Sequence, residues 1–178
     1  MSVFTNSANG ASENASAYVT AILELLGDRD PVAVLQETPA ALLQAIHGLS
    51  PQQLRRPERE GKWSIGQILQ HLADAEVVWA WRMRLILAQD RAPLTGYDQD
   101  LWAQRLHYEE ADPSDAIEMF TVLRRSNLRL VARATPAELK HVGVQVERGE
   151  ESLERLRRLY AGHDLLHLQQ LDRVRRSL

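Results

Sequence analysis

Residues 151–176 read ESLERLRRLYAGHDLLHLQQLDRVRR, and this stretch carries the strongest structural signal of the 178-residue chain. Its apolar side chains recur at steps of three and four residues, which is the period of one face of an α-helix. The inward series consists of Leu153, Leu156, Tyr160, His163, His167, Gln170 and Val174, with Leu171 beside it. His163 and His167 are therefore expected to face a helical core, one turn apart.

Three further segments repeat this period and predict long helices. The first spans residues 15–26, and the second spans residues 65–89 after a capping box formed by Ser64 and Gln67. The third begins at Pro113, where a proline is favoured in the first helical turn. Four principal helices joined by connections of unequal length predict an all-α four-helix bundle.

The connections carry weaker signals. Thr38-Pro39 has the form of an N-cap followed by proline, and it predicts a short helix that continues to Ile46. Residues 90–111 are irregular, and residues 141–150 are expected to form a loop with at most a short extended piece. Short additional helices are therefore expected in the connections, and a sheet is not.

The composition predicts one globular domain over residues 15–178, preceded by a flexible tail over residues 1–14. Apolar residues make up 44% of the chain and charged residues 25%, as in an ordinary globular protein. No run approaches the ~20 apolar residues of a membrane span and no signal sequence is evident, so we expect a cytoplasmic protein. The formal net charge of −3 gives no support for nucleic-acid binding.

The chain contains no cysteine. This excludes a disulfide framework, a thiolate nucleophile from the chain itself and any metal centre with cysteine ligands. A bound metal ion would have to be held by nitrogen and oxygen atoms.

The stacked pair His163 and His167 has two interpretations. Each neutral ring carries one donor and one acceptor, and leaving either group unpaired in a core costs roughly 1–3 kcal/mol. A cation that accepts both lone pairs removes much of that cost. Taken alone, the pair is equally consistent with satisfied core side chains and with metal ligands.

His71 favours the metal interpretation. It borders the apolar stripe of the helix over residues 65–89, and across a bundle it could complete a three-nitrogen site with open positions for water or substrate. Asp74 and Asp164 each lie three residues from one of these histidines. They are candidates to accept the N–H groups of the rings, or they are exposed carboxylates.

The remaining histidines, His47, His107 and His141, have no partners at a ligand spacing, so we expect them at the surface or at helix ends. Four tryptophans are interpreted as packing residues: Trp63, Trp79, Trp81 and Trp102.

Three motifs together resemble the DinB superfamily, which is also described as the YfiT-like family of metal-dependent hydrolases. The motifs are Gly61-Lys-Trp-Ser64, His71-Leu-Ala-Asp-Ala-Glu76 and Ala161-Gly-His-Asp-Leu-Leu-His167. Their order and spacing are more specific than any one of them, and the resemblance extends from about Tyr18 to Val174.

The resemblance implies a four-helix bundle that binds a divalent ion through His71, His163 and His167. The ion would be Zn, Ni, Mn or Fe. Relatives are often homodimers, and some transfer or isomerise substrates with a low-molecular-weight thiol as cofactor. Some relatives carry a histidine before the glutamate in the segment Gln145-Val-Glu147, and this chain has none there, which leaves a role for that loop in doubt.

Two functions follow as alternatives. The first is a metal-dependent enzyme that acts on a small-molecule substrate and activates water, as a hydrolase, or a thiol, as a thiol transferase. Glu76, Glu147 and Tyr160 are candidates for an acid or base. The second is a non-catalytic stress-response or binding protein of the same fold with a structural or vestigial metal.

Trp79 and Trp81 bear on the predicted homodimer. Side chains two residues apart on a helix point about 200° from each other, so both cannot face one core. We expect Trp81 either to anchor a partner helix or to be covered by the segment over residues 90–111.

Overall fold

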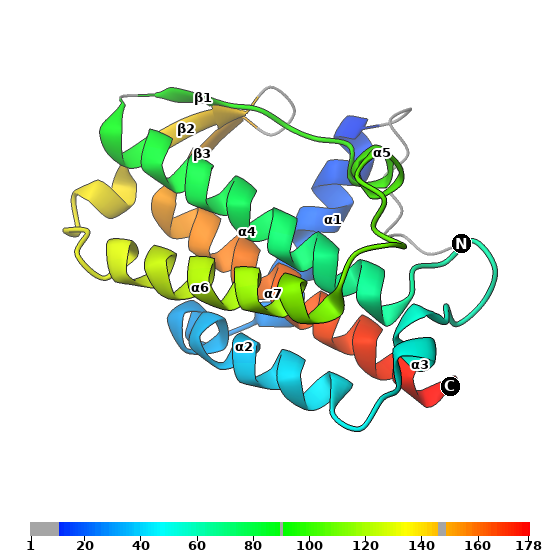
Figure 1. The fold of residues 1–178 in the computed structure, drawn as a ribbon. Coiled ribbons are helices and arrows are strands. Elements are labelled where there is room, and N and C mark those ends of the chain that lie inside the picture. The colour runs from blue at the N-terminus through cyan, green and yellow to red at the C-terminus, as the bar shows by residue number, and fades with distance from the viewer. Residues whose placement is uncertain (1–10, 90, 146–148) are drawn as a thin grey trace.

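The computed structural model describes residues 11–89, 91–145 and 149–178, which form a bundle of long helices (Figure 1). α4 and α6 run in one direction, and α2 and α7 run in the opposite direction. α2 and α4 each contact both α6 and α7, which closes the bundle. The predicted all-α four-helix bundle is confirmed, and its helices are α2 (Pro31–Ile46), α4 (Ile65–Ala88), α6 (Pro113–Val131) and α7 (Leu153–Arg176).

The first helix of the chain lies outside this bundle. α1 (Ala11–Leu26) packs against α7, where Ile22 contacts Leu159. Gly162 permits the close approach, because a Cβ atom on that residue would overlap the carbonyl group of Ile22. α1 begins four residues before the predicted start, and the rest of the predicted tail, residues 1–10, lies outside the described residues.

α2 takes the place in the bundle that the sequence pattern assigns to the first helix. It begins at Pro31, with the side chain of Asp30 accepting the Val32 N–H, so the prediction of an N-cap at Thr38 is wrong. Pro39 lies inside the helix and offers no N–H to the carbonyl oxygen of Leu35. That oxygen instead accepts a bond of 2.9 Å from Arg124 on α6, which lowers the cost of an internal proline.

Two apolar clusters lie along the bundle, in addition to the small cluster between α1 and α7. One includes Trp79 on α4 and Leu156 on α7, and the other includes Ile68 on α4 and Leu171 on α7. His163, Asp164 and His167 lie along α7 between the residues of these two clusters. Within the described ranges, none of the helices combines the length and the apolar character needed to cross a membrane.

A small sheet joins two of the connections, which the sequence analysis did not predict. β1 pairs in parallel with β2, and β2 pairs in an antiparallel manner with β3. Gly143 is required in β2, because a Cβ atom there would lie 2.6 Å from the side chain of Leu94. The elements in the connections are α3 (Pro51–Arg55), β1 (Ala92–Leu94), α5 (Gln99–Arg105), the 3₁₀-helix η1 (Glu138–Lys140), β2 (Val142–Gln145) and β3 (Gly149–Ser152).

Candidate metal centre

The structure brings together the three histidines selected from the sequence. His71 comes from the second turn of α4, and His163 and His167 come from consecutive turns of α7. One ligand atom from each ring lies within 4.8 Å of the other two. His71 and His167 are buried, and His163 is the most exposed of the three residues, at an intermediate level.

The spacing of the ring nitrogens suits a metal ion. The Nε2 atoms of His71 and His163 are 3.1 Å apart. Two nitrogen ligands at 2.0–2.1 Å from a tetrahedral ion lie about 3.3 Å from each other. A divalent ion therefore fits between these rings with small side-chain adjustments.

All three imidazoles are held in the neutral form, which is the form that binds metal. Burial lowers the pKa of His71 and His163 well below the ordinary value, and the charge of His167 lowers both further. Burial also lowers the pKa of His167 to about 4, although the hydrogen bond that the ring donates to Gln170 and the charge of Asp164 both act to raise it. The lone pairs of the three rings are thus available near neutral pH.

The other ring nitrogens differ in their partners. Nδ1 of His167 lies 2.8 Å from Oε1 of Gln170, which fixes the proton on Nδ1 and leaves Nε2 as an acceptor. Nδ1 of His71 and Nδ1 of His163 are buried and have no partner among the residues that the structure describes.

The two aspartates predicted to accept from the rings bond elsewhere. Asp74 accepts from the Tyr108 hydroxyl at 2.5 Å and from the Gln70 amide at 3.2 Å. Asp164 accepts from Thr38 and Arg124. Neither carboxylate is hydrogen-bonded to an imidazole, although both are buried and neither is the exposed carboxylate of the alternative interpretation.

Two aromatic residues near the site went unrecognised as neighbours. The Trp63 ring centroid lies 5.1 Å from that of His71, and the Tyr108 centroid lies 6.3 Å from that of Trp63. Trp63 immediately precedes the helix that carries His71, and this position is what in the sequence suggests that the two rings are close. Tyr108 follows α5 in a segment without periodicity, so no pattern pointed to it.

The three candidate acids or bases are not equivalent. Glu76 is buried, and its carboxylate faces Arg124 and Asn127. The Tyr160 ring stacks on Trp79 and lies 6.2 Å, between centroids, from His163. Glu147 lies outside the described residues. The three remaining histidines are exposed, as predicted: His47, His107 and His141.

The chain has relatives among known proteins. Residues 35–171 match the model of the DinB superfamily. The chain is 28% identical over 148 residues to "Putative metal-dependent hydrolase YfiT" of Bacillus subtilis, covering 83% of each chain. It is 26% identical over 161 residues to a protein of Bacillus mycoides that is also named a "putative metal-dependent hydrolase", covering 90% of this chain and 92% of that one.

A solved structure agrees with the sequence comparisons. The structure of YfiT from Bacillus subtilis, described as a four-helix bundle of unusual topology, superposes with a TM-score of 0.73 at 28% identity. The superposition covers 80% of this chain and 84% of that one. Because the family match spans most of the sequence, including all three histidines, the chain belongs to the DinB superfamily.

Proposed function

We propose that this protein is a metal-dependent enzyme in which His71, His163 and His167 hold one divalent ion. The observation that carries the proposal is a cluster of three neutral imidazoles with ligand atoms within 4.8 Å of one another, in which the Nε2 atoms of His71 and His163 are 3.1 Å apart. The names of the relatives as metal-dependent hydrolases support the same conclusion.

An all-nitrogen set of ligands suits Zn, Ni, Mn or Fe, and availability in the cell would decide among them. A divalent ion held by three neutral ligands supplies Lewis acidity, which lowers the pKa of a water or thiol that binds in an open position. The chain itself keeps the rings neutral through burial and orients His167 through Gln170.

Two reactions fit this centre: hydrolysis with water, and transfer of a low-molecular-weight thiol to a small electrophilic substrate. The thiol would be supplied from outside, because the chain has no cysteine. His163, the most exposed of the three residues, offers the side from which a small molecule would reach the site.

The test is a pair of activity screens on metal-loaded protein, one with ester and amide substrates and one with thiols and electrophiles. We expect turnover in one screen, lost in His167→Ala and retained in His107→Ala, whose ring is exposed elsewhere. A metal-loaded protein inactive in both screens would instead support a non-catalytic binding or stress-response protein with a structural metal.

The proposal includes a homodimer formed through the outer face of α4. Trp79 is fully buried, whereas Trp81 is 63% exposed and Val77, one turn earlier, is 42% exposed. The segment over residues 91–111 therefore does not cover Trp81. Light scattering should give twice the mass of the 20.2 kDa chain. The variant Trp81→Glu should reduce the mass to that of the monomer. The control Leu106→Glu, at another exposed apolar residue, should leave the mass of the dimer unchanged.

A further inference from the structure

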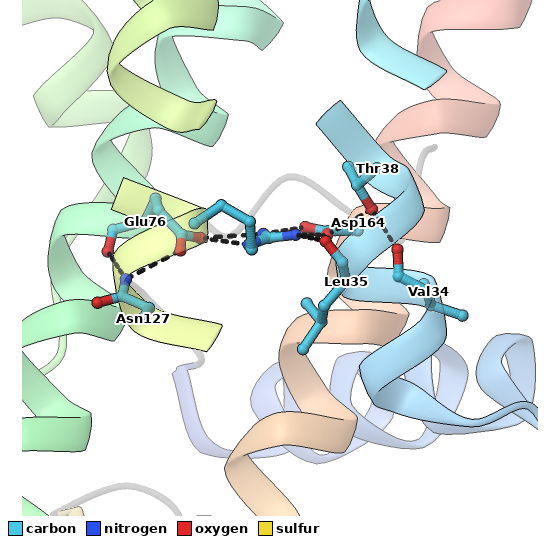
Figure 2. Close-up of polar contacts among 7 residues, drawn as sticks. Val34, Leu35, Thr38, Glu76, Asn127 and Asp164 are labelled. Carbon is cyan, nitrogen blue, oxygen red and sulfur yellow. Dashed lines mark hydrogen bonds and ion pairs between the residues drawn. The ribbon is translucent and has the colours of Figure 1, made fainter. Parts of the chain in front are cut away.

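A second polar cluster lies in the core, centred on Arg124 of α6. Figure 2 shows it, with the residues around the arginine labelled. Arg124 is 1% exposed, and its guanidinium carbon lies 4.4 Å from the centre of the Phe120 ring and 5.4 Å from that of Trp79. Its charge pairs with two carboxylates, Glu76 on α4 and Asp164 on α7.

Each of the three guanidinium nitrogens has an acceptor. Nε donates to Oε2 of Glu76 at 3.0 Å, and Nη2 and Nη1 donate to the two carboxylate oxygens of Asp164 at 3.1 and 2.6 Å. Nη1 also donates to the Leu35 carbonyl oxygen at 2.9 Å, and Nη2 lies 2.9 Å from Oε2 of Glu76 as an ion pair. These bonds hold the planar guanidinium in one orientation.

The two carboxylates also accept hydrogen bonds from side chains other than Arg124. Thr38 on α2 donates to Asp164 at 2.8 Å, and Asn127 on α6 donates to Glu76 at 2.9 Å. The network therefore joins all four helices of the bundle through buried, directional bonds, as Figure 2 shows.

The two carboxylates are attached to the helices that carry the histidines. Asp164 follows His163 directly, so its side chain leaves α7 about 100° round the axis from that ring. Glu76 lies five residues after His71, which places it about 140° round α4. By holding these two side chains, Arg124 restricts the rotation of α4 and of α7 about their axes, and that rotation decides whether the three rings converge.

Stability alone does not account for such a network. Buried ion pairs are weak evidence for stability, because apolar side chains of similar volume often replace them without loss. What apolar side chains cannot supply is a fixed orientation. We propose that Arg124 is a positioning residue for the histidine cluster, acting through Asp164 and Glu76 without touching the rings. This inference rests on the proposed metal site.

The test compares metal affinity with stability. In the variant Glu76→Met/Arg124→Met/Asp164→Leu, apolar side chains replace the arginine and both of its carboxylate partners, so no buried charge is left unpaired. The matched control is Arg176→Met, which removes an exposed ion pair with Asp172 on the same helix α7. Four readouts are needed. Three are the free energy of unfolding, the Zn²⁺ affinity by chelator competition, and the absorption spectrum with Co²⁺ bound. The fourth is the imidazole ¹⁵N spectrum of the metal-free protein.

We expect the triple variant to remain folded, to bind Zn²⁺ about 10–100-fold more weakly and to give an altered Co²⁺ spectrum, as when groups that orient metal ligands are lost. The inference would be overturned if the Zn²⁺ affinity stayed within about threefold of the wild type, well short of a 10-fold loss, and the Co²⁺ and ¹⁵N spectra were unchanged. If the triple variant does not fold, Thr38→Val decides, because it removes one bond to Asp164 at constant shape. It should move the same readouts in the same direction, and no change would overturn the inference.

The imidazole spectra separate this inference from the proposed function. A wild-type protein that binds no metal would refute the metal site. Displaced signals of the three rings in the metal-free triple variant would still support the positioning role of Arg124, and undisturbed signals would refute it.

Discussion

The two polar clusters between α4 and α7 satisfy their hydrogen-bonding groups in opposite ways. In the Arg124 network each guanidinium nitrogen has an acceptor within the chain. In the histidine cluster, Nδ1 of His71 and Nδ1 of His163 have no partner among the described residues, and the Nε2 atoms of the same two rings are 3.1 Å apart. The first cluster is satisfied by the chain itself, and the second is the one that we propose holds a metal ion. The predictions below test this difference, beginning with the largest effect.

Breaking the complete cluster should destabilise the protein most. Arg124→Met leaves the carboxylates of Glu76 and Asp164 buried without their cation, and loss of one partner of a buried pair costs about 3–5 kcal/mol. Guanidinium denaturation should show this loss, whereas Arg176→Met, at an exposed pair, should change the unfolding free energy by about 1 kcal/mol or less. Equal losses of unfolding free energy in Arg124→Met and Arg176→Met would contradict the proposed difference between the buried network and an exposed ion pair.

Acid should destabilise the metal-free protein through the second cluster. Burial lowers the pKa of His167 to about 4, while an unfolded histidine titrates near 6.5. Between those values the unfolded state binds more protons, so the stability present above pH ~6.5 is lost as the pH falls towards ~4. His167 alone accounts for on the order of 3 kcal/mol, and the lowered pKa values of His71 and His163 act in the same direction.

Denaturation midpoints measured between pH 7 and pH 4 will show the slope, and His167→Gln should reduce it. A slope that is the same in His167→Gln would mean that this ring is not held neutral by burial.

The smallest effect is expected at Pro39. A proline inside a helix usually costs about 3 kcal/mol, partly because a carbonyl loses its N–H partner. Here the Leu35 carbonyl oxygen accepts from Arg124 instead. Pro39→Ala should therefore raise the free energy of unfolding by only about 1 kcal/mol, below the usual cost of an internal proline. A gain near the full 3 kcal/mol would show that the bond from Arg124 does not compensate.

The histidine cluster could be predicted because it depends on local periodicity. Helical spacing alone placed His163 and His167 on the inward face of α7 and His71 beside the inward face of α4. Gln170 belongs to the same inward series, but its bond to His167 needed the structure. The family resemblance and the periodicity selected the same three rings.

What could not be predicted depends on contacts that are distant in sequence. Thr38-Pro39 has the form of a helix start, and only the bond from Arg124, 89 residues away from Leu35, explains why the helix continues through it. The strands β1 and β2 are three and four residues long, which is too short to show a period. They come from different connections and pair at long range, as Ala92 does with Gly143. Asp74 lies three residues from His71, and this spacing made it a candidate to accept from that ring. Its actual partner, Tyr108, comes from an irregular segment, so no pattern predicts the bond between them.

The most direct test of the central claim is the metal content of the protein. Protein purified without chelator, or reloaded with Zn, Ni, Mn or Fe, should contain close to one ion per chain by elemental analysis, because three neutral imidazoles converge on one point. His167→Ala should lose most of that metal, and His107→Ala should retain it. Protein that holds no metal after reloading, or equal occupancy in the two variants, would contradict the assignment of His71, His163 and His167 as the metal site.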